Sequence, residues 1–179
     1  MPKKWFKILA PKIFNKMEIG QSLSEEGKDL LGRTISLPLS TLLGDRSRHY
    51  VIVKLKIVDA KEGKAFTEIK SMKISRSYLV RYVRRRTSRV DSIDDVVTKD
   101  GKRMRIKSLL VTAFKAKRRQ RYSLRKALSE EVKKRLKEYT ADAFVLSVSV
   151  GKFQATIKKK LSKIYPLRFS EIRVIEMKD

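Results

Sequence analysis

The sequence has no cysteine, a single histidine and only seven glycines in 179 residues. Without cysteine the chain can form neither disulfide bonds nor thiolate metal sites, which fits a reducing interior. No apolar run approaches the roughly 20 residues that a membrane-spanning helix requires. The lysine-rich start, Met1 to Phe6, is followed by neither a sustained apolar stretch nor a small-residue cleavage site. We therefore expect a cytoplasmic protein that makes no contact with a membrane.

Motifs that support catalysis or cofactor binding are missing as well. The only histidine, His49, belongs to no histidine, aspartate and glutamate set with metal-ligand spacing. The glycines form no phosphate-binding loop, and no KH or RRM signature of RNA-binding domains is present. Asp94 and Asp95 are neighbours in a stretch expected to be extended, where successive side chains point to opposite sides. We predict no catalytic residue, no metal and no cofactor.

Acidic residues are also scarce, and this is the most informative shortage. The chain carries 45 Lys and Arg against 19 Asp and Glu, a formal net charge of +26. A compact body of that charge repels itself and is best stabilised beside a polyanion. Nucleic acid is the commonest such partner, since its phosphates supply negative charge at high density. The hydrophobic fraction of 41% is large enough for a real core, so we do not expect wholesale disorder.

Hydrophobic periodicity in the first half of the chain indicates mainly extended structure. Apolar side chains are interleaved with lysines near the start, and a later stretch alternates between an apolar and a lysine-bearing face. We expect an extended basic arm at residues 1–30, a short strand at 33–37, a half-buried strand at 49–59, a turn at 61–63 and a returning strand at 65–74.

The second half alternates between helical and extended patterns. Asp100-Gly101 favours the positive backbone angles of a tight primed hairpin turn. Residues 141–150 are ambiguous, because β-branched content favours a strand whereas their place between two helical patterns favours a helix. We expect a helix at 75–86, strands at 89–97 and 102–114, helices at 122–139 and 153–164, and a short strand at 172–175.

The first candidate binding cluster lies on the expected helix at 75–86 and just beyond it. No acidic residue occurs from Arg76 through Val90. Arginine presents a planar fork that suits phosphate oxygens, and Tyr78 and Tyr82 could stack on unpaired bases. A solvated helix face normally mixes charges of both signs, so we favour nucleic-acid binding over that simpler interpretation. The candidate residues are Arg76, Arg81, Arg84, Arg85, Arg86 and Arg89.

The second cluster runs from the end of the expected strand at 102–114 into the long helix. No acidic residue falls between Gly101 and Ser129. Ordering so basic a loop without anions would be costly, so we expect it to be mobile in isolation and ordered on RNA. The candidate residues are Lys115, Lys117, Arg118, Arg119, Arg121, Arg125 and Lys126. In the N-terminal arm, Lys3, Lys4 and Lys7 are further candidates for phosphate contacts.

Four motifs then follow one another in order between about residues 3 and 175. They are Lys4 to Phe14 with Ile19-Gly20, Ile74 to Leu79 with Val83 to Arg86, Thr98 to Gly101 with Arg105 to Lys107, and Ile164 to Arg168 with Glu171 to Arg173. In order and spacing they resemble the S-three-Ae, or eS-one, family of archaeal and eukaryotic ribosomal proteins. The lack of the longer eukaryotic tails favours the archaeal form.

This resemblance implies a structural protein of the small ribosomal subunit. It implies binding to ribosomal RNA on the platform, near the 3′ end of the small-subunit rRNA and the mRNA exit. Neighbouring small-subunit ribosomal proteins, and mRNA near the exit, are the other partners it implies. For the fold it implies an α+β protein with an antiparallel β-rich body that closes toward a barrel, packed helices, and a helix at 141–150. We accordingly expect the arm at 1–30 and a single globular RNA-binding domain at 31–179.

Charge alone leaves other functions open. A free-standing DNA-binding, chromatin or RNA-binding protein could have the same composition. A nuclease or RNA-modifying enzyme would need a metal cluster or a cofactor loop. A protein that binds anionic membranes usually carries one amphipathic basic helix, whereas the charge here is spread over strands, loops and helices.

Overall fold

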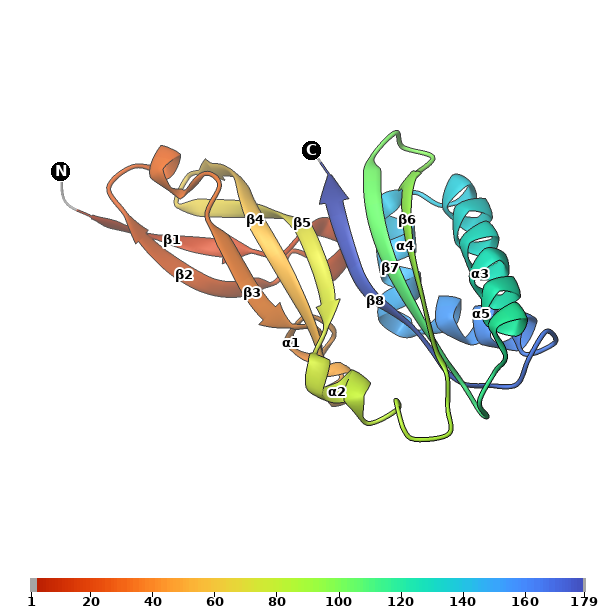
Figure 1. Ribbon diagram of the computed structural model, residues 1–179. Coiled ribbons are helices and arrows are strands. Elements are labelled where there is room, and N and C mark those ends of the chain that lie inside the picture. The colour runs from red at the N-terminus through yellow and green to blue at the C-terminus, as the bar shows by residue number, and fades with distance from the viewer. Residues whose placement is uncertain (1–2, 179) are drawn as a thin grey trace. The chain divides into compact units, whose positions relative to one another are not determined.

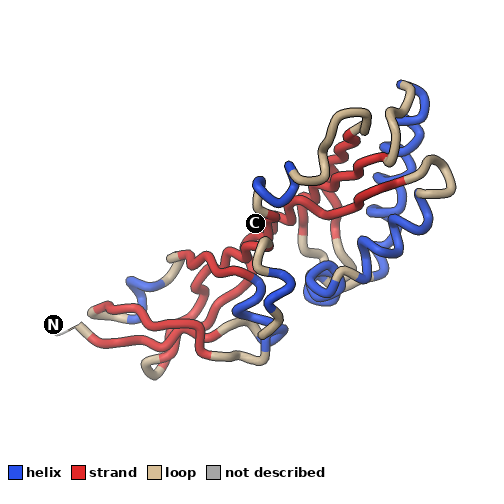
Figure 2. Tube along the Cα trace, turned by 90° about the horizontal axis from the view of Figure 1, so that it is seen from below, coloured by secondary structure: helices blue, strands red, loops and turns tan. Residues whose placement is uncertain are grey.

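The computed structural model describes residues 3–178, so Met1 and Pro2, the first residues of the expected arm, lie outside the described residues. The chain divides into two compact units, one up to Met72 and one from Lys73 onward. Strands dominate the first unit, whereas the second combines strands with long helices (Figure 2). The expected division after residue 30 differs from this one, because residues on both sides of position 30 share one sheet and one core.

The first unit is a sheet with short helical turns between its strands (Figure 1). The strand order is β2-β1-β5-β4-β3. β1 pairs antiparallel with β2 and parallel with β5, and β3 pairs antiparallel with β4. The elements are β1 (Lys4–Leu9), η1 (Lys12–Phe14), β2 (Glu18–Ser24), η2 (Gly27–Leu30), β3 (Thr34–Pro38), α1 (Leu39–Leu43), η3 (Arg46–Arg48), β4 (Val51–Lys61) and β5 (Lys64–Ile74).

The segment expected to form a basic arm is built into this sheet. Along β1 the side chains alternate, so that Phe6 and Ile8 are buried while Lys4 and Lys7 are exposed. Phe6 and Ile8 pack in one core cluster with Leu30, Ile57 and Ala65. Its apolar residues therefore hold this segment in the fold of the first unit.

β4 and β5 confirm the hairpin expected from the alternating pattern. Val51, Val53, Leu55 and Ile57 are all nearly inaccessible to solvent. The connecting residues Glu62 and Gly63 both have positive φ, 53° and 74°, as a two-residue primed turn requires.

The second unit consists of an antiparallel sheet in the order β8-β7-β6, with helices packed against it. The helices α3, α4 and α5 gather on one face of this sheet (Figure 1). The elements of the unit are α2 (Arg76–Val80), β6 (Arg89–Val97), β7 (Arg103–Thr112), α3 (Arg118–Glu138), α4 (Ala141–Val150), α5 (Lys152–Leu161) and β8 (Leu167–Lys178). No helix within residues 3–178 is long and apolar enough to span a membrane.

The long helix α3 confirms the four-residue apolar spacing of the sequence. Leu124, Leu128, Val132 and Leu136 are all buried, because they form the stripe that faces the sheet and the other helices. In β7, Leu109, Leu110 and Val111 are all buried as well, which confirms that both faces of the sheet are covered at that point.

Residues 141–150 form a helix, as the family resemblance implied. Phe144, Val145 and Val148 are buried at helical spacing. The ends are set by Thr140, whose hydroxyl accepts a hydrogen bond from the Ala143 N–H, and by Gly151, which has φ of 87°. Burial along one helix face and these two caps outweigh the strand preference of the β-branched residues.

The expected turn at residues 99–101 is present, but its conformation differs. Among the described turn residues only Gly101 has positive φ, 75°. The Gly101 N–H donates to the Thr98 carbonyl and the Thr98 N–H to the Lys102 carbonyl, which is a three-residue hairpin loop with glycine at the left-handed position. Asp100 is thereby free to accept a hydrogen bond from the Ala141 N–H at 3.0 Å, at the start of α4.

The α+β class is confirmed, but the expected closure toward a barrel is not found. In the first unit the strand order ends at β2 and β3, and closure would require these end strands to find further partners. The β1–β5 pair is also parallel, so the sheet is mixed and not wholly antiparallel. Closure was implied only by the family resemblance, because hydrophobic alternation assigns side chains to faces but does not specify which strands pair.

Candidate nucleic-acid interface

The first basic cluster lies mainly on an irregular loop. α2 ends at Val80, so the helix expected at 75–86 is confirmed only over residues 76–80. Val83, which would continue the apolar stripe, is 39% exposed and finds no core to pack against. A short helix depends on such packing for its stability. Arg81, Arg84, Arg85 and Arg86 consequently lie in the loop before β6, and Arg86 has positive φ, 64°.

The two tyrosines of this cluster are used in packing. The Tyr82 ring stacks on Phe169 with 3.8 Å between the ring centroids. The Tyr78 ring contacts both of these rings in a tilted orientation. The two tyrosine hydroxyl groups also share a hydrogen bond of 3.1 Å. Both rings thus cover the cluster of Leu79, Leu109, Val111 and Phe169, and their stacking on bases stays a prediction.

The second basic cluster begins on a short loop and continues along α3. The helix starts at Arg118, four residues before the expected start, and the Lys117 N–H donates to Gln120 Oε1 at 2.9 Å. Cations are disfavoured at a helix N-terminus by the macrodipole, and no serine, threonine, aspartate or asparagine precedes the helix. For both reasons, the sequence contains no signal that a helix begins at Arg118. Arg118, Arg119, Arg121, Arg125 and Lys126 project from the first turns of α3.

Buried hydroxyl groups join the two clusters. The Ser88 N–H donates to Thr112 Oγ1 at 2.8 Å, and the Thr112 N–H donates to the Ser88 carbonyl at 2.9 Å. Ser88 Oγ in turn accepts a hydrogen bond of 2.9 Å from the Ala116 N–H. Ser88 is adjacent to Arg89, and Ala116 lies between Lys115 and Lys117. These contacts place segments that are 28 residues apart side by side at one end of the second unit.

We define the basic surface as the exposed cations of these two segments of the second unit. Its members are Arg76, Arg81, Arg84, Arg85, Arg86, Arg89, Lys115, Lys117, Arg118, Arg119, Arg121, Arg125 and Lys126. Every one of them is exposed.

Few of these cations are neutralised within the protein. Arg89 holds Asp91 through two hydrogen bonds of 2.7 and 2.9 Å, which raise the pKa of its guanidinium group. Arg125 Nε donates to the Asp91 carbonyl at 3.0 Å. Within residues 3–178, no other member of the basic surface forms an ion pair with a carboxylate. The surface therefore retains most of its positive charge for an external partner.

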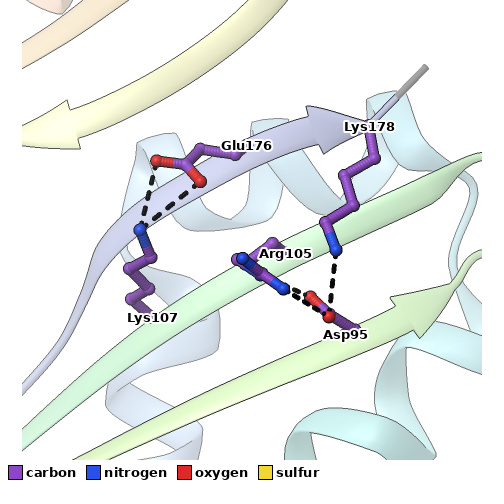
Figure 3. Close-up of polar contacts among 5 residues, drawn as sticks. All are labelled: Asp95, Arg105, Lys107, Glu176 and Lys178. Carbon is purple, nitrogen blue, oxygen red and sulfur yellow. Dashed lines mark hydrogen bonds and ion pairs between the residues drawn. The ribbon is translucent and has the colours of Figure 1, made fainter.

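The exposed face of the β8-β7-β6 sheet is different, because Arg105, Lys107 and Lys178 are paired with acids there (Figure 3). Arg105 makes two hydrogen bonds of 2.8 Å to Asp95, and Lys178 adds a third of 3.0 Å. Lys107 contacts Glu176 at 3.3 Å. Hydrogen bonds from Arg105, and then from Lys178, hold the pKa of Asp95 far below its ordinary value. The unit thus carries a network of paired charges on this face and mostly unpaired cations on the basic surface.

Asp94 and Asp95 point to opposite sides of β6, as expected from a strand. Asp95 joins the network just described, whereas Asp94 is buried and accepts hydrogen bonds from Ser92 and from Ser129 of α3. Lys133 Nζ lies 3.7 Å from the Asp94 carboxylate. Asp94 thereby ties α3 to the sheet. In the part of the chain that the structure describes, no group of three His, Asp or Glu side chains is placed to hold a metal ion.

The three candidate lysines of the expected arm lie in the first unit. Lys3 precedes β1, and Lys4 and Lys7 are exposed on that strand. Lys7 Nζ lies 3.1 Å from Glu18 of β2, and this hydrogen bond lowers the pKa of Glu18. The structure does not gather these lysines into the same unit as the basic surface.

Two further cations beside the basic surface were missed by sequence reasoning. The Tyr165 hydroxyl donates to the Lys115 carbonyl at 3.2 Å, and the Ala113 N–H donates to the Pro166 carbonyl at 2.9 Å. These bonds hold the segment between α5 and β8 against the second cluster. Lys163 is exposed in that segment, and Arg168 is exposed at the start of β8. In the sequence, the one hint that Lys163 and Arg168 lie beside the basic surface is that both are close to Pro166, a residue typical of chain reversals.

Known proteins resemble this chain over most of its length. The Ribosomal S3Ae family matches residues 1–179. A protein named small ribosomal subunit protein eS1 from Staphylothermus marinus is 34% identical over 170 residues, which cover 95% of this chain and 80% of that protein. Proteins of the same name from Saccharolobus islandicus and Saccharolobus solfataricus are 36% and 35% identical, with 95% of this chain and 82% of each covered. The whole-chain match and these archaeal relatives show that the chain belongs to the Ribosomal S3Ae family.

Proposed function

We propose that this protein is a structural constituent of the small ribosomal subunit and binds ribosomal RNA through the basic surface. The observation that carries the proposal is the convergence of two segments rich in unpaired cations onto one end of the second unit. Membership of the Ribosomal S3Ae family, and relatives named small ribosomal subunit protein eS1, support the ribosomal assignment.

The proposed mechanism is neutralisation of phosphates by cations on a folded scaffold. Arginines of the basic surface present planar donor pairs to phosphate oxygens, and each contact releases condensed counterions from the RNA. Arg84 and Arg85 on the loop, and Arg118 and Arg119 on α3, are the leading candidates because they are exposed and form no ion pair within residues 3–178. Sheet and helices serve to position these groups, and the proposal includes no catalytic step.

The finer assignment concerns the place of the protein on the ribosome. We propose a position on the platform, near the 3′ end of the small-subunit rRNA and the mRNA exit, with neighbouring ribosomal proteins as further partners. Lys3, Lys4 and Lys7 of the first unit would add contacts to rRNA or to those neighbours. This assignment implies a cytoplasmic location on the small subunit, and it rests on the family resemblance.

The test is sedimentation of a lysate of the source cell through a sucrose gradient, with detection of this chain at low and at high magnesium. We expect stoichiometric migration with the small subunit that survives moderate salt, because many phosphate contacts act together. Crosslinking of the chain to RNA in that fraction would then identify the nucleotides at the basic surface and test the platform position.

A different distribution in the gradient would overturn the proposal. Chain found only at the top of the gradient, or with chromatin, would favour a free-standing nucleic-acid-binding protein, whose basic surface would serve the same electrostatic purpose. The matched variant carries Gln at Arg84, Arg85, Arg118 and Arg119, and it should leave the small-subunit fraction at lower salt than the wild type.

A further inference from the structure

Two large aromatic rings stand exposed within the second basic cluster. Phe114 is 66% exposed and Tyr122 is 67% exposed. No acidic residue occurs from Lys102 to Ser129, the stretch that contains both. Neither ring takes part in a ring-to-ring contact among the described residues, in contrast with Tyr78 and Tyr82. These rings therefore remain available to an external partner.

Cations surround Tyr122 on the helix. Arg118 and Arg119 precede it by four and three residues, and Arg125 and Lys126 follow it by three and four. Residues at these spacings are neighbours on a helix surface. All four cations are exposed, so the side chain of Tyr122 lies among positive charges that no carboxylate interrupts.

The backbone at Phe114 is held in place. Its carbonyl accepts a hydrogen bond of 2.6 Å from Thr112 Oγ1, and Thr112 is completely buried. Phe114 is separated from Arg118 by four residues, and Tyr122 is about one helical turn further on, so the two α-carbons are at most about 20 Å apart. Both rings thus lie on one short stretch of the chain.

An aromatic ring among unpaired cations matches the chemistry of single-stranded nucleic acid. Unpaired bases stack on aromatic side chains while the phosphates meet arginine and lysine. Bases in a duplex are already stacked on one another, so a duplex can use the cations of this surface but not the rings. A surface that binds only phosphates makes its contacts through cations and does not require two exposed aromatic rings.

We propose that Phe114 and Tyr122 form a stacking site for unpaired nucleotides of RNA, with Arg118, Arg119, Arg125 and Lys126 holding the adjoining phosphates. This inference rests on the proposed function and deepens it, because it specifies single-stranded RNA as the ligand of this part of the basic surface. The exposed rings, and not Tyr78 and Tyr82, supply the base contacts.

The test uses the full chain and a fluorescent 12-nucleotide adenylate strand, compared with an RNA duplex of equal length. The variant Phe114→Leu/Tyr122→Leu removes both rings without changing charge. We expect it to bind the single strand about 5- to 150-fold more weakly for each base that can no longer stack. Affinity for the duplex should stay within about twofold, and the salt dependence should not change, because every cation remains.

Ring-retaining variants provide the matched control. Phe114→Tyr/Tyr122→Phe should bind the single strand as the wild type does. The fluorescence of a 2-aminopurine placed in that strand should be quenched by the wild type and by this variant, but not by the leucine variant. Equal binding of the strand by the wild type and the leucine variant would overturn the stacking site while leaving the proposed function intact, and would indicate that a protein neighbour covers the rings. Failure of the wild type to bind any RNA would overturn the proposed function itself.

Discussion

The hydroxyl group of Thr112 makes three contacts in the buried junction between the basic segments. Its oxygen accepts from the Ser88 N–H at 2.8 Å and lies 3.2 Å from the Ser88 carbonyl, and its O–H donates to the Phe114 carbonyl at 2.6 Å. Buried polar groups of this kind are costly when their hydrogen-bond partner is removed. The junction thus connects the stability of the second unit with the placement of Phe114, Lys115 and Arg89.

At the residue scale, Thr112→Val tests this junction. The change keeps the shape of the side chain but leaves the Ser88 N–H without its acceptor, so the free energy of unfolding should fall by about 1–3 kcal/mol. Urea denaturation measures the effect. Thr156→Val is the control, because its hydroxyl bonds to the Lys152 carbonyl on an exposed helix surface, and a change within about 0.5 kcal/mol is expected there. Equal losses of stability in the two variants would contradict the role of Thr112.

Asp95 provides a second prediction at this scale. Its pKa is held below the ordinary value of 3.8 by hydrogen bonds from Arg105 and Lys178. A lowered pKa in the folded state means that this stabilisation is present above pH 3.8 and is lost as pH falls toward the folded-state pKa. Asp95→Asn should therefore be less stable than the wild type at neutral pH, and the difference should shrink in acid.

Urea unfolding of both proteins at about pH 7 and about pH 3 measures this difference. The control is Glu25→Gln, which changes the net charge equally at an exposed carboxylate that makes no ion pair within residues 3–178. A stability difference for Asp95→Asn that is the same at both pH values would rule out the network as its cause.

At the element scale, α4 shows how capping decides a helix whose composition is ambiguous. Thr140 and Asp100 accept hydrogen bonds from N–H groups of its first turn, and the Gly151 N–H donates to carbonyls of its last turn. Asp100 comes from the tip of the β6–β7 hairpin, 41 residues away in sequence. The hairpin loop and the helix therefore stabilise each other. The helix and strand propensities of neighbouring residues cannot predict this contact.

Gly151→Ala tests the end of this helix. Gly151 has φ of 87°, and a side chain in the left-handed region costs about 1–2 kcal/mol. We expect the free energy of unfolding to fall by that amount, measured by thermal or urea denaturation. Gly20→Ala is the matched control, since Gly20 lies in β2 with open space where a Cβ would be added. A destabilisation at Gly20 as large as at Gly151 would contradict the conformational explanation.

At the scale of the whole molecule, the net charge is +26, and the unpaired cations are unevenly distributed over the surface. Arg105, Lys107 and Lys178 on the exposed face of the second sheet are paired with acids, whereas the cations of the basic surface are mostly unpaired. Only the unpaired cations can exchange solvent and counterions for RNA phosphates without breaking an internal ion pair. The affinity for RNA should therefore depend on the location of a cation and not only on the total charge.

Neutralising Arg118, Arg119 and Arg121 together with Gln tests this distribution. Each phosphate that is no longer neutralised should reduce the slope of log K against log salt by about 0.7–0.9, so the slope should fall by about 2–3 units. Fluorescence anisotropy with small-subunit rRNA at several salt concentrations measures it.

The control neutralises three exposed lysines of α5, namely Lys152, Lys158 and Lys159, which removes the same total charge. Its slope should change less, because these lysines lie outside the basic surface. An equal change in both variants would show that RNA binding responds to total charge only.

Most elements of this fold were predictable because hydrophobic periodicity is a local property. The alternation in β4 and the four-residue stripe of α3 each reflect one buried face. The predictions were wrong at helix ends, where packing against the core and an unusual capping contact decide the outcome. α2 stops at Val80 because Val83 finds no core, and α3 starts at Arg118 through a bond from Lys117 to Gln120.

The sequence by itself determined the sign of the charge, the polyanionic class of partner and the family, since these depend on composition and on ordered motifs. It also determined which segments have a local excess of cations, because acids are missing from both. Only the tertiary structure decided that Ser88 and Ala116 join these segments, and that Phe114 and Tyr122, not Tyr78 and Tyr82, stay exposed. The physical reason is that burial and long-range hydrogen bonds depend on residues distant in sequence, which spacing along the chain does not encode.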